Sequence, residues 1–344
     1  MSAPKAAIFG CAGPELSASE RDFFARHDPF GFILFARNCE TPEQVARLVA
    51  DLRSSVGRAD APVLIDQEGG RVQRLKPPHW RQAPAAARFG ELFRREPALA
   101  REAVEFNMRL IAAELLALGI DVDCVPCIDV PVPGAHDVIG DRAFSPQAEI
   151  VADLGRVAAQ TMLDMGVMPV IKHIPGHGRA GVDSHHALPL VETAAIELQH
   201  SDFLPFSALS DMPWGMTAHV LYAAIDAERP ATTSPVVIER IVRGLIGFNG
   251  LLLSDDLSME ALGGSLAARA AAALAAGCDI ALHCNGRMPE MEQVARVAPP
   301  LGAASLERIA RGRARLRTPP RLPNAGEIAA WQRRLDALLA PNAA

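Results

Sequence analysis

The sequence predicts an α/β fold, a single (β/α)8 barrel of the TIM type. Three observations lead to this prediction: apolar runs of strand length recur eight times, amphipathic helical segments separate them, and polar residues gather after several of the runs. Strands that alternate with helices pair in parallel, and eight such repeats close a barrel. A chain of 344 residues is long enough for one barrel of this size.

The expected strands are short runs rich in β-branched and apolar residues. They span residues 6–9, 32–35, 62–65, 122–126, 168–171, 215–218, 251–253 and 280–282. Apolar residues at helical spacing predict helices over 42–56, 98–118, 147–165, 194–209, 235–246 and 266–276. Two later helices are expected, at 306–317 as a solvated outer face and at 327–339.

No linker or change of composition divides the chain, so residues 1–344 are expected to form one catalytic barrel domain. Residues 319–344 are expected to be a C-terminal helical extension packed on the barrel. The net charge of −6 and the absence of a basic run argue against nucleic acid or an anionic membrane surface as a partner.

No apolar run approaches the roughly 18 residues of a membrane span, and no signal-peptide pattern opens the sequence. We therefore expect a cytoplasmic protein, acting as a monomer without a cofactor or a metal. The six cysteines are scattered, as buried thiols are. Cys124 and Cys127 form a lone C-x-x-C pair with no second pair, which is weak evidence for a zinc or redox site.

Polar residues cluster where successive predicted strands end, which is where a barrel places its active site. The densest cluster follows Lys172 and His173, in a loop that also holds Asp183 and His185. Residues i and i+2 of an extended loop project to the same side, so the carboxylate of Asp183 is expected to bond one ring nitrogen of His185. The other nitrogen is then free for proton transfer, as in hydrolase triads.

The polar runs as a set resemble glycoside hydrolase family 3, and within it the short bacterial β-N-acetylglucosaminidases. The matching runs are D-Q-E-G-G-R-V-Q-R at 66–74, K-H-I-P-G-H-G at 172–178, D-S-H at 183–185, T-A-H-V at 217–220 and S-D-D-L-S-M at 254–259. The resemblance extends from about residue 30 to about residue 290. A family member often has Phe where Ile174 stands, and the Cys124–Cys127 pair is not part of the family pattern.

The resemblance implies that Asp255 is the nucleophile and that His185 is the acid/base, with Asp183 as its partner. It also implies a group of residues that hold the hydroxyl and N-acetyl groups of the sugar: Asp66, Arg74, Arg142, Lys172 and His173. A structural or supporting role is expected for His177 and His219. Since Asp255 and Asp256 are neighbours, one should point into the barrel mouth, and Asp256 is expected to orient a cation or to cap the next helix.

The implied reaction is the retaining release of terminal GlcNAc from GlcNAc β-1,4-linked to anhydro-N-acetylmuramic acid peptides, a step of cytoplasmic peptidoglycan recycling. The substrate partner is then a small muropeptide. An aromatic content of 5% also fits a closed pocket for one sugar better than a long polysaccharide groove. Three glycines, Gly176, Gly178 and Gly181, lead us to expect a mobile loop that closes over the sugar.

Two alternative activities remain open from the sequence. A histidine acid/base is neutral once it has given up its proton, so it repels phosphate less than a carboxylate would, and a phosphorylase is conceivable. A metal-dependent hydrolase would use ligands from His173, His177, Asp183, His185 and His186. Pro175 and two glycines, however, forbid a helix that would bring His173 and His177 to one face.

Overall fold

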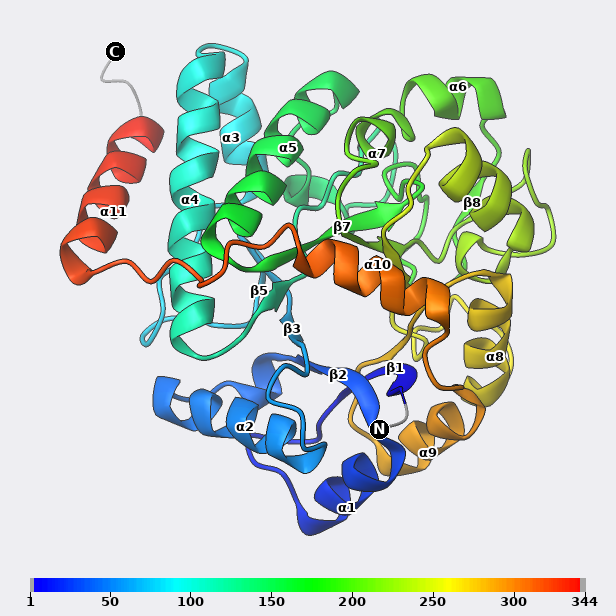
Figure 1. Cartoon of the computed structure of the whole chain (residues 1–344). Coiled ribbons are helices and arrows are strands. Elements are labelled where there is room, and N and C mark those ends of the chain that lie inside the picture. Colours follow the sequence, from blue (N-terminus) through cyan, green and yellow to red (C-terminus); the bar gives the residue numbers. More distant parts are fainter. Residues whose placement is uncertain (1–2, 341–344) are drawn as a thin grey trace.

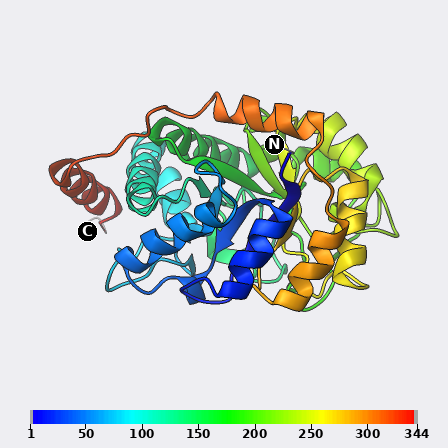
Figure 2. The same ribbon diagram turned by 60° about the horizontal axis from the view of Figure 1, so that its bottom comes forward.

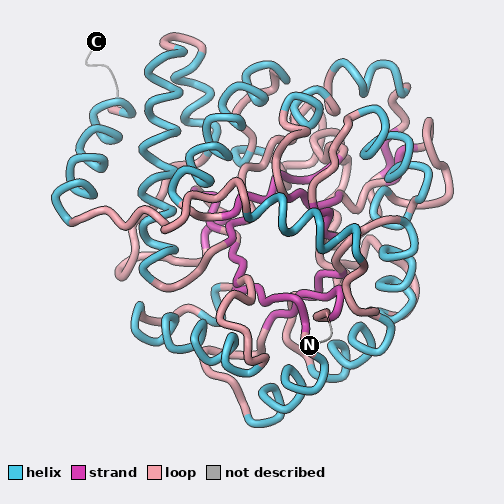
Figure 3. Tube along the Cα trace, viewed as in Figure 1, coloured by secondary structure: helices cyan, strands magenta, loops and turns pink. Residues whose placement is uncertain are grey.

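The predicted barrel is present in the computed structural model, which describes residues 3–340. Eight parallel strands surround one axis within that range, and Figure 3 shows them as a ring with helices outside it. The strands are β1 (Lys5–Gly10), β2 (Pro29–Leu34), β3 (Val63–Ile65), β6 (Val122–Asp123), β7 (Met168–Ile174), β9 (Trp214–Thr217), β11 (Leu251–Leu253) and β12 (Ala281–His283). Each predicted run overlaps one of these strands, so the predicted fold class is confirmed.

Neighbours in the ring follow one another in the chain. β1 pairs with both β2 and β12, and the ring is completed where Leu253 of β11 pairs with Ile280, just before β12. β6 is shorter than its predicted run of 122–126, because the N–H of Val125 turns back to the carbonyl of Asp123 at 2.8 Å and Pro126 has no N–H to give to a ladder. All eight strands run the same way, so their carboxyl ends lie together at one end of the barrel.

Helices surround the strands in the order that the chain supplies them (Figure 1). They are α1 (Ala18–His27), α2 (Pro42–Ser55), α3 (Ala86–Phe93), α4 (Pro97–Ala117), α5 (Ala148–Met165), α6 (Ala195–His200), α7 (Leu204–Ala208), α8 (Leu266–Ala276), α9 (Met288–Val297), α10 (Ala303–Arg313) and α11 (Ala325–Leu339). A π-helix, η4 (Val237–Leu245), and three 3-10 turns, η1 (Ala36–Asn38), η2 (Gly140–Arg142) and η3 (Ala231–Thr233), complete the helical elements of the described residues.

The helix predicted over 194–209 is wrong as a single element, because it is divided into α6 and α7. Pro205 stands in the first turn of α7, where its missing N–H is tolerated. In the middle of one continuous helix, the same residue would remove a backbone hydrogen bond. Between the two helices, the carboxylate of Asp202 accepts a hydrogen bond from Arg179 Nε at 2.7 Å. The break therefore brings a carboxylate to the loop that follows β7.

The helix predicted over 306–317 is α10, and most of its residues are exposed, as expected of a solvated outer face. Ile309 and Gly312 are buried, and a Cβ at Gly312 would lie 3.1 Å from Pro213 Cβ and 3.2 Å from Trp214 Nε1. Trp214 is the first residue of β9, so α10 lies across one edge of the amino end of the barrel, where Figures 2 and 3 show it in orange and cyan respectively.

The last described helix, α11, packs against α4 at the outside of the barrel (Figure 1). Trp331 is its main buried side chain, and the guanidinium groups of Arg109 and Arg321 lie over the indole ring. Arg334 donates to Glu102 of α4 at 2.7 and 2.8 Å. Residues 1–2 and 341–344, at the two ends of the predicted 1–344 domain, lie outside the described residues.

Two small sheets extend the loops at the carboxyl end of the barrel. β4 (Gln67–Gly69) and β5 (Val72–Gln73) form an antiparallel pair after β3, and β8 (Leu190–Val191) pairs in parallel with β10 (Leu221–Tyr222). The first of these pairs holds the polar run that follows β3. Across residues 3–340, no helix combines the length and the apolar character that crossing a bilayer requires.

Candidate active site

One cavity of about 220 Å³ lies at the carboxyl end of the barrel, among the strand ends and the loops that follow them. Its polar lining includes seven of the eight predicted site residues: Asp66, Arg74, Arg142, Lys172, His173, His185 and Asp255. Asp183, the eighth, stands behind the cavity wall and contacts His185. The apolar part of the wall includes Phe35, Met216 and Leu282.

Asp66 follows β3 and joins two cations at the cavity. Its carboxylate accepts hydrogen bonds from Lys172 Nζ at 2.6 Å and from Arg74 Nη2 at 2.9 Å. Burial alone would raise the pKa of Asp66, but the charges of Lys172 and Arg74 hold it well below its usual range. Asp66 is therefore an ionised acceptor whose position is fixed from two sides.

Glu68 is a site residue that the sequence interpretation missed. Its carboxylate bonds both Nε and Nη2 of Arg142, at 2.9 and 2.8 Å, and lies 2.7 Å from Lys172 Nζ. Burial would raise the pKa of Glu68, but Arg142 and Lys172 lower it to about 2. The available signal was its spacing from Asp66, because residues two apart in an extended segment face the same way.

Asp255 follows β11 and presents its carboxylate to the cavity. Its Oδ1 accepts a hydrogen bond from the backbone N–H of Asp256 at 2.8 Å, and no residue of the described chain donates to Oδ2. Burial would raise the pKa of Asp255, but His219, His173 and the N–H of Asp256 lower it. An ionised carboxylate with one free oxygen is suited to nucleophilic attack.

Asp256 has a different environment from its neighbour. Its Oδ1 accepts from the backbone N–H groups of Ser258 and Cys284, at 3.0 and 3.1 Å, and its Oδ2 from Ser258 Oγ at 2.6 Å. The expected helix cap or cation contact is wrong, because this carboxylate caps the turn after β11 and joins it to the end of β12. Asp256 also lines part of the cavity.

His185 and Asp183 form the hydrogen bond that their spacing predicts. The ring Nδ1 of His185 lies 2.7 Å from Asp183 Oδ1, and the backbone N–H of His185 donates to the same oxygen at 2.9 Å. Burial would raise the pKa of Asp183, but these two contacts lower it. The His185 side chain is 61% exposed, so its Nε2 is accessible at the cavity.

The segment that carries His185 contacts the loop after β11. The backbone carbonyl of Ser184 accepts from the N–H of Ala261 at 3.3 Å, and that of His185 accepts from Glu260 at 3.4 Å. These contacts hold the imidazole on the side of the cavity where Asp255 lies. The mobility expected for residues 176–186 stays a prediction.

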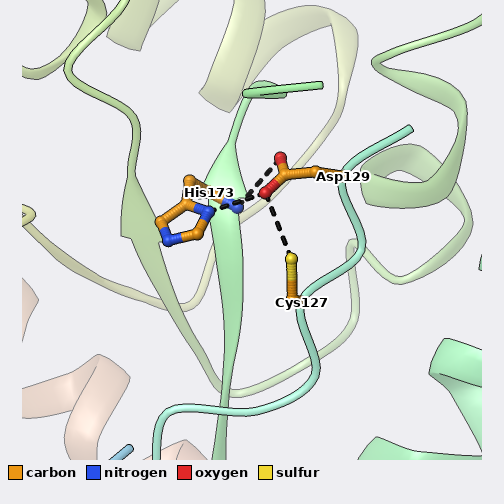
Figure 4. Close-up of side chains that lie close together, drawn as sticks. All are labelled: Cys127, Asp129 and His173. Carbon is orange, nitrogen blue, oxygen red and sulfur yellow. Dashed lines mark hydrogen bonds and ion pairs between the residues drawn. The ribbon is translucent and has the colours of Figure 1, made fainter. Parts of the chain in front are cut away.

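Asp129 is a second site residue that the sequence interpretation missed. It is completely buried, and its Oδ2 lies 2.6 Å from His173 Nδ1 (Figure 4). Its Oδ1 accepts from the backbone N–H of His177 at 2.6 Å, and Cys127 Sγ donates to Oδ2 at 3.3 Å. Burial would raise the pKa of Asp129, but the imidazole of His173 keeps it below the usual range. The sequence offered little signal, because Asp129 stands in an apolar run.

The group Cys127, Asp129 and His173 is also the single set of three side chains, among those described, that brings potential metal ligands together. A separation of 2.6 Å between His173 Nδ1 and Asp129 Oδ2 is typical of a charge-assisted hydrogen bond. Two ligands bound to zinc at about 2.0–2.2 Å in a tetrahedral site would lie roughly 3.3–3.6 Å apart. The geometry therefore fits a hydrogen-bonded group, and the ligand set of the metal-dependent alternative is not assembled.

Cys124 and Cys127 are both buried free thiols. Burial raises the pKa of each well above the ordinary value for cysteine, so neither is a reactive thiolate. His219 is also buried, with Nδ1 bonded to Thr232 Oγ1 at 2.7 Å and Nε2 to the carbonyl of Asp256 at 3.0 Å. Both of its ring nitrogens are therefore used to support the turn that carries Asp255.

Known proteins resemble this chain over most of its length. The pattern described as "Glycosyl hydrolase family 3 N terminal domain" matches residues 10–317. A curated relative, "Beta-hexosaminidase" of Methylococcus capsulatus, is 43% identical over 282 residues, which cover 81% of this chain and 82% of the relative.

Solved structures agree with the sequence relatives. Native NagZ from Neisseria gonorrhoeae is 30% identical and covers 99% of both chains with a TM-score of 0.87. NagZ from the same organism in complex with N-trifluoroacetyl-D-glucosamine is 29% identical and covers 98% of both chains with a TM-score of 0.85. Together, the barrel, the pattern match and the relatives show that the chain is a glycoside hydrolase that belongs to glycosyl hydrolase family 3.

Proposed function

We propose that the chain is a retaining exo-β-N-acetylglucosaminidase. The observation that carries the proposal is that Asp255 and His185 line one cavity, together with polar side chains able to bind a single sugar. The similarity to a β-hexosaminidase, and to a NagZ that binds N-trifluoroacetyl-D-glucosamine, supports an N-acetylhexosamine as the sugar. The small cavity volume and the scarcity of aromatic side chains support cleavage at a chain end.

In the first half of the proposed reaction, Asp255 attacks the anomeric carbon while protonated His185 gives its proton to the leaving oxygen. A covalent glycosyl-enzyme results, and the aglycone departs. In the second half, His185 removes a proton from water, which attacks the same carbon and releases the sugar with its configuration retained. Asp183 holds the imidazole by Nδ1 and stabilises its protonated form, so Nε2 performs both proton transfers.

The sugar-binding groups offer complementary hydrogen bonds around a pyranose ring. Asp66 accepts from hydroxyl groups, while Arg74, Arg142 and Lys172 donate. His173 contributes its Nε2, since Nδ1 is occupied by Asp129. Asp66 and Glu68 hold these donors in place, so the site does not need to reorganise when sugar binds.

The natural substrate that we propose is GlcNAc β-1,4-linked to an anhydro-N-acetylmuramic acid peptide, which would place the protein in cytoplasmic peptidoglycan recycling as a monomer. The resemblance to the short bacterial members of the family supports this choice. Mass spectrometry of GlcNAc released from such a muropeptide, compared with release from chitobiose, tests it. Equal or slower release from the muropeptide would contradict this substrate.

Variants measured on an aryl β-N-acetylglucosaminide test the proposed roles. Asp255→Ala should lose on the order of 10⁴-fold or more in kcat, because no other described carboxylate at the cavity has a free oxygen in its place. His185→Ala should lose roughly 10²–10⁴-fold, and less on a substrate with a good leaving group. Asp256→Asn, which keeps its acceptor for the two N–H groups, should retain at least about a tenth of the activity. An Asp255→Ala enzyme with wild-type turnover would refute the mechanism.

Phosphorolysis is a second candidate activity, favoured by the imidazole acid/base. After it donates its proton, His185 is neutral and does not repel an incoming phosphate. Product analysis with phosphate varied separates the two activities: a hydrolase yields free GlcNAc throughout, whereas a phosphorylase yields the sugar 1-phosphate. Activity that survives a chelator removes the metal-dependent alternative as well.

A further inference from the structure

Asp129 is a completely buried carboxylate that has no part in the steps proposed above. Four donors converge on it: Cys127 Sγ at 3.3 Å, His173 Nδ1 at 2.6 Å, and the backbone N–H groups of His173 and His177 at 3.3 and 2.6 Å. Burying a charge is unfavourable unless it is fully hydrogen-bonded. Three of the four donors belong to His173 and His177, which both line the cavity, so this buried carboxylate needs a functional explanation.

The contact with His173 selects one form of its ring. A carboxylate can only accept, so neutral His173 must carry its proton on Nδ1. Nε2 is then left with a lone pair, and Arg142 Nη2 lies 3.5 Å from it. A contact of 3.5 Å is at the outer limit of a hydrogen bond, and His173 lines the cavity, so this lone pair can accept from a sugar hydroxyl group instead of from Arg142.

His177 connects Asp129 to the segment that carries the proposed acid/base, His185. The backbone of His177 is held by Asp129, and its ring Nε2 lies 2.9 Å from Ser184 Oγ. Ser184 is buried and stands between Asp183 and His185 in the chain. Burial is the main cause that lowers the pKa of His177 to about 4, and the imidazole of His173 is the second cause. The His177 ring that makes this hydrogen bond is therefore neutral at neutral pH.

We propose that Asp129 is a positioning residue for the reaction, acting on both halves of the site. Through His173 it sets a hydrogen-bond acceptor toward the sugar, and through His177 and Ser184 it fixes the segment that holds His185 at the cavity. Neither effect requires Asp129 to touch the substrate. The kinetic part of this inference rests on the proposed glycosidase function.

A spectroscopic test determines which ring nitrogen of His173 carries the proton. Two-bond ¹H–¹⁵N spectra of histidine-labelled wild-type protein, recorded over a pH series, should show the neutral His173 ring protonated at Nδ1 and bare at Nε2. The signal is assigned by its loss in His173→Gln. In Asp129→Asn the side-chain amide can donate to Nδ1, so the ring should shift to the Nε2–H form. A wild-type ring protonated at Nε2 would overturn the proposal.

The kinetic test separates the two effects. Asp129→Asn should lose roughly 10- to 100-fold in kcat/KM on an aryl β-N-acetylglucosaminide. Ser184→Ala should leave the His173 spectrum unchanged and lower kcat more for a poor leaving group than for a good one, because it removes the hydrogen bond that joins His177 to the acid/base segment. A Ser184→Ala enzyme with an unchanged leaving-group dependence would overturn the second half of the proposal.

Asp123→Asn is the matched control, since Asp123 is equally buried at the end of β6 but does not line the cavity. Its Oδ1 accepts from the N–H of Gln67 at 2.9 Å, which an amide oxygen also does. An Asp129→Asn enzyme that equals Asp123→Asn in kcat/KM would overturn the positioning role. If wild type fails to cleave the substrate, the proposed function fails, whereas the His173 spectrum still decides the ring form.

Discussion

Five charged side chains alternate in sign at the cavity. In spatial order they are Arg74, Asp66, Lys172, Glu68 and Arg142. Each carboxylate is shared by two cations, so removal of either one leaves an arginine without a carboxylate partner and leaves Lys172 with one carboxylate instead of two. Loss of one member of a buried ion pair is far more destabilising than loss of an exposed pair.

Glu68→Gln is the sharpest residue-level test of this arrangement. The neutral amide cannot balance the charge of Arg142, and Lys172 keeps only Asp66, so we expect a free energy of unfolding lower by about 3 kcal/mol. The two donors also lose their fixed positions, so kcat/KM should fall by roughly 10- to 100-fold. Urea denaturation and steady-state kinetics measure the two effects.

Glu228→Gln provides the control for this prediction. Glu228 is exposed, and its carboxylate makes no hydrogen bond or ion pair among the described residues. The same chemical change there should alter stability by less than about 0.5 kcal/mol. If Glu68→Gln matches this control in stability and kinetics, the alternating charges do not organise the site.

The elements that the sequence predicts well are those with a strong apolar pattern. The eight strands were found because each is buried on both faces, which gives short continuous apolar runs. Three helices, α1, α3 and α9, have no predicted counterpart. For α1 a signal was present, since Ser17 and Glu20 form a capping box. The helix buries little besides Phe23 and Phe24, so its periodicity is weak.

The position of α10 is a tertiary feature that local sequence does not reveal. Its basic residues resemble an exposed face, and Arg311 does pair with Glu307 at the surface, but Arg308 contacts the buried carboxylate of Asp279. Ile309 and Gly312 mark the side that meets the barrel, and the absence of a side chain at Gly312 permits the close approach to Pro213 and Trp214. A single glycine in a helix is too weak a signal to place it.

Gly312→Val tests the role of α10. The added methyl groups have no room against Pro213 and Trp214, so we expect the free energy of unfolding to fall by about 1–3 kcal/mol. Ala304→Val, on the exposed side of the same helix, controls for helix propensity and should cost well under 1 kcal/mol. Thermal or urea denaturation compares the two. Equal stability of the two variants would show that α10 is not packed tightly on the barrel.

At the scale of the whole molecule, the site is assembled from strand ends far apart in the sequence. The residues at strand ends were predictable because they are charged and stand where apolar runs stop, as Asp66, Lys172 and Asp255 do. Glu68 and Asp129 were missed because their role is to hold other site residues, and such contacts depend on the closed barrel. Sequence therefore revealed the groups that face the cavity better than those behind them.

Asp123 makes the stability of the whole molecule depend on pH. Burial raises the pKa of this carboxyl group to about 8, so the folded protein holds a proton that the unfolded chain loses near pH 4. The folded state binds more protons between about pH 4 and pH 8, so Asp123 lowers stability progressively as pH rises through that window. The slope for one group is at most about 1.4 kcal/mol per pH unit.

Asp123→Asn removes this titration. The free energy of unfolding of the variant minus that of wild type should be larger at pH 8 than at pH 5.5. Urea denaturation of both proteins at both pH values measures it. The remaining titratable groups cancel in this comparison of differences. A stability difference between variant and wild type that is the same at both values would contradict the raised pKa of Asp123.

The packed interior of the barrel also has a consequence for how molecules enter and leave the site. Because the strands are buried in one continuous core, molecules reach Asp255 through the mouth at the carboxyl end. The first sugar to enter is then the last to leave, and the incoming water must follow the path that the departing aglycone has vacated. Free sugar added to the medium enters through the same opening and occupies the same site as the substrate. We therefore expect product inhibition by the released monosaccharide.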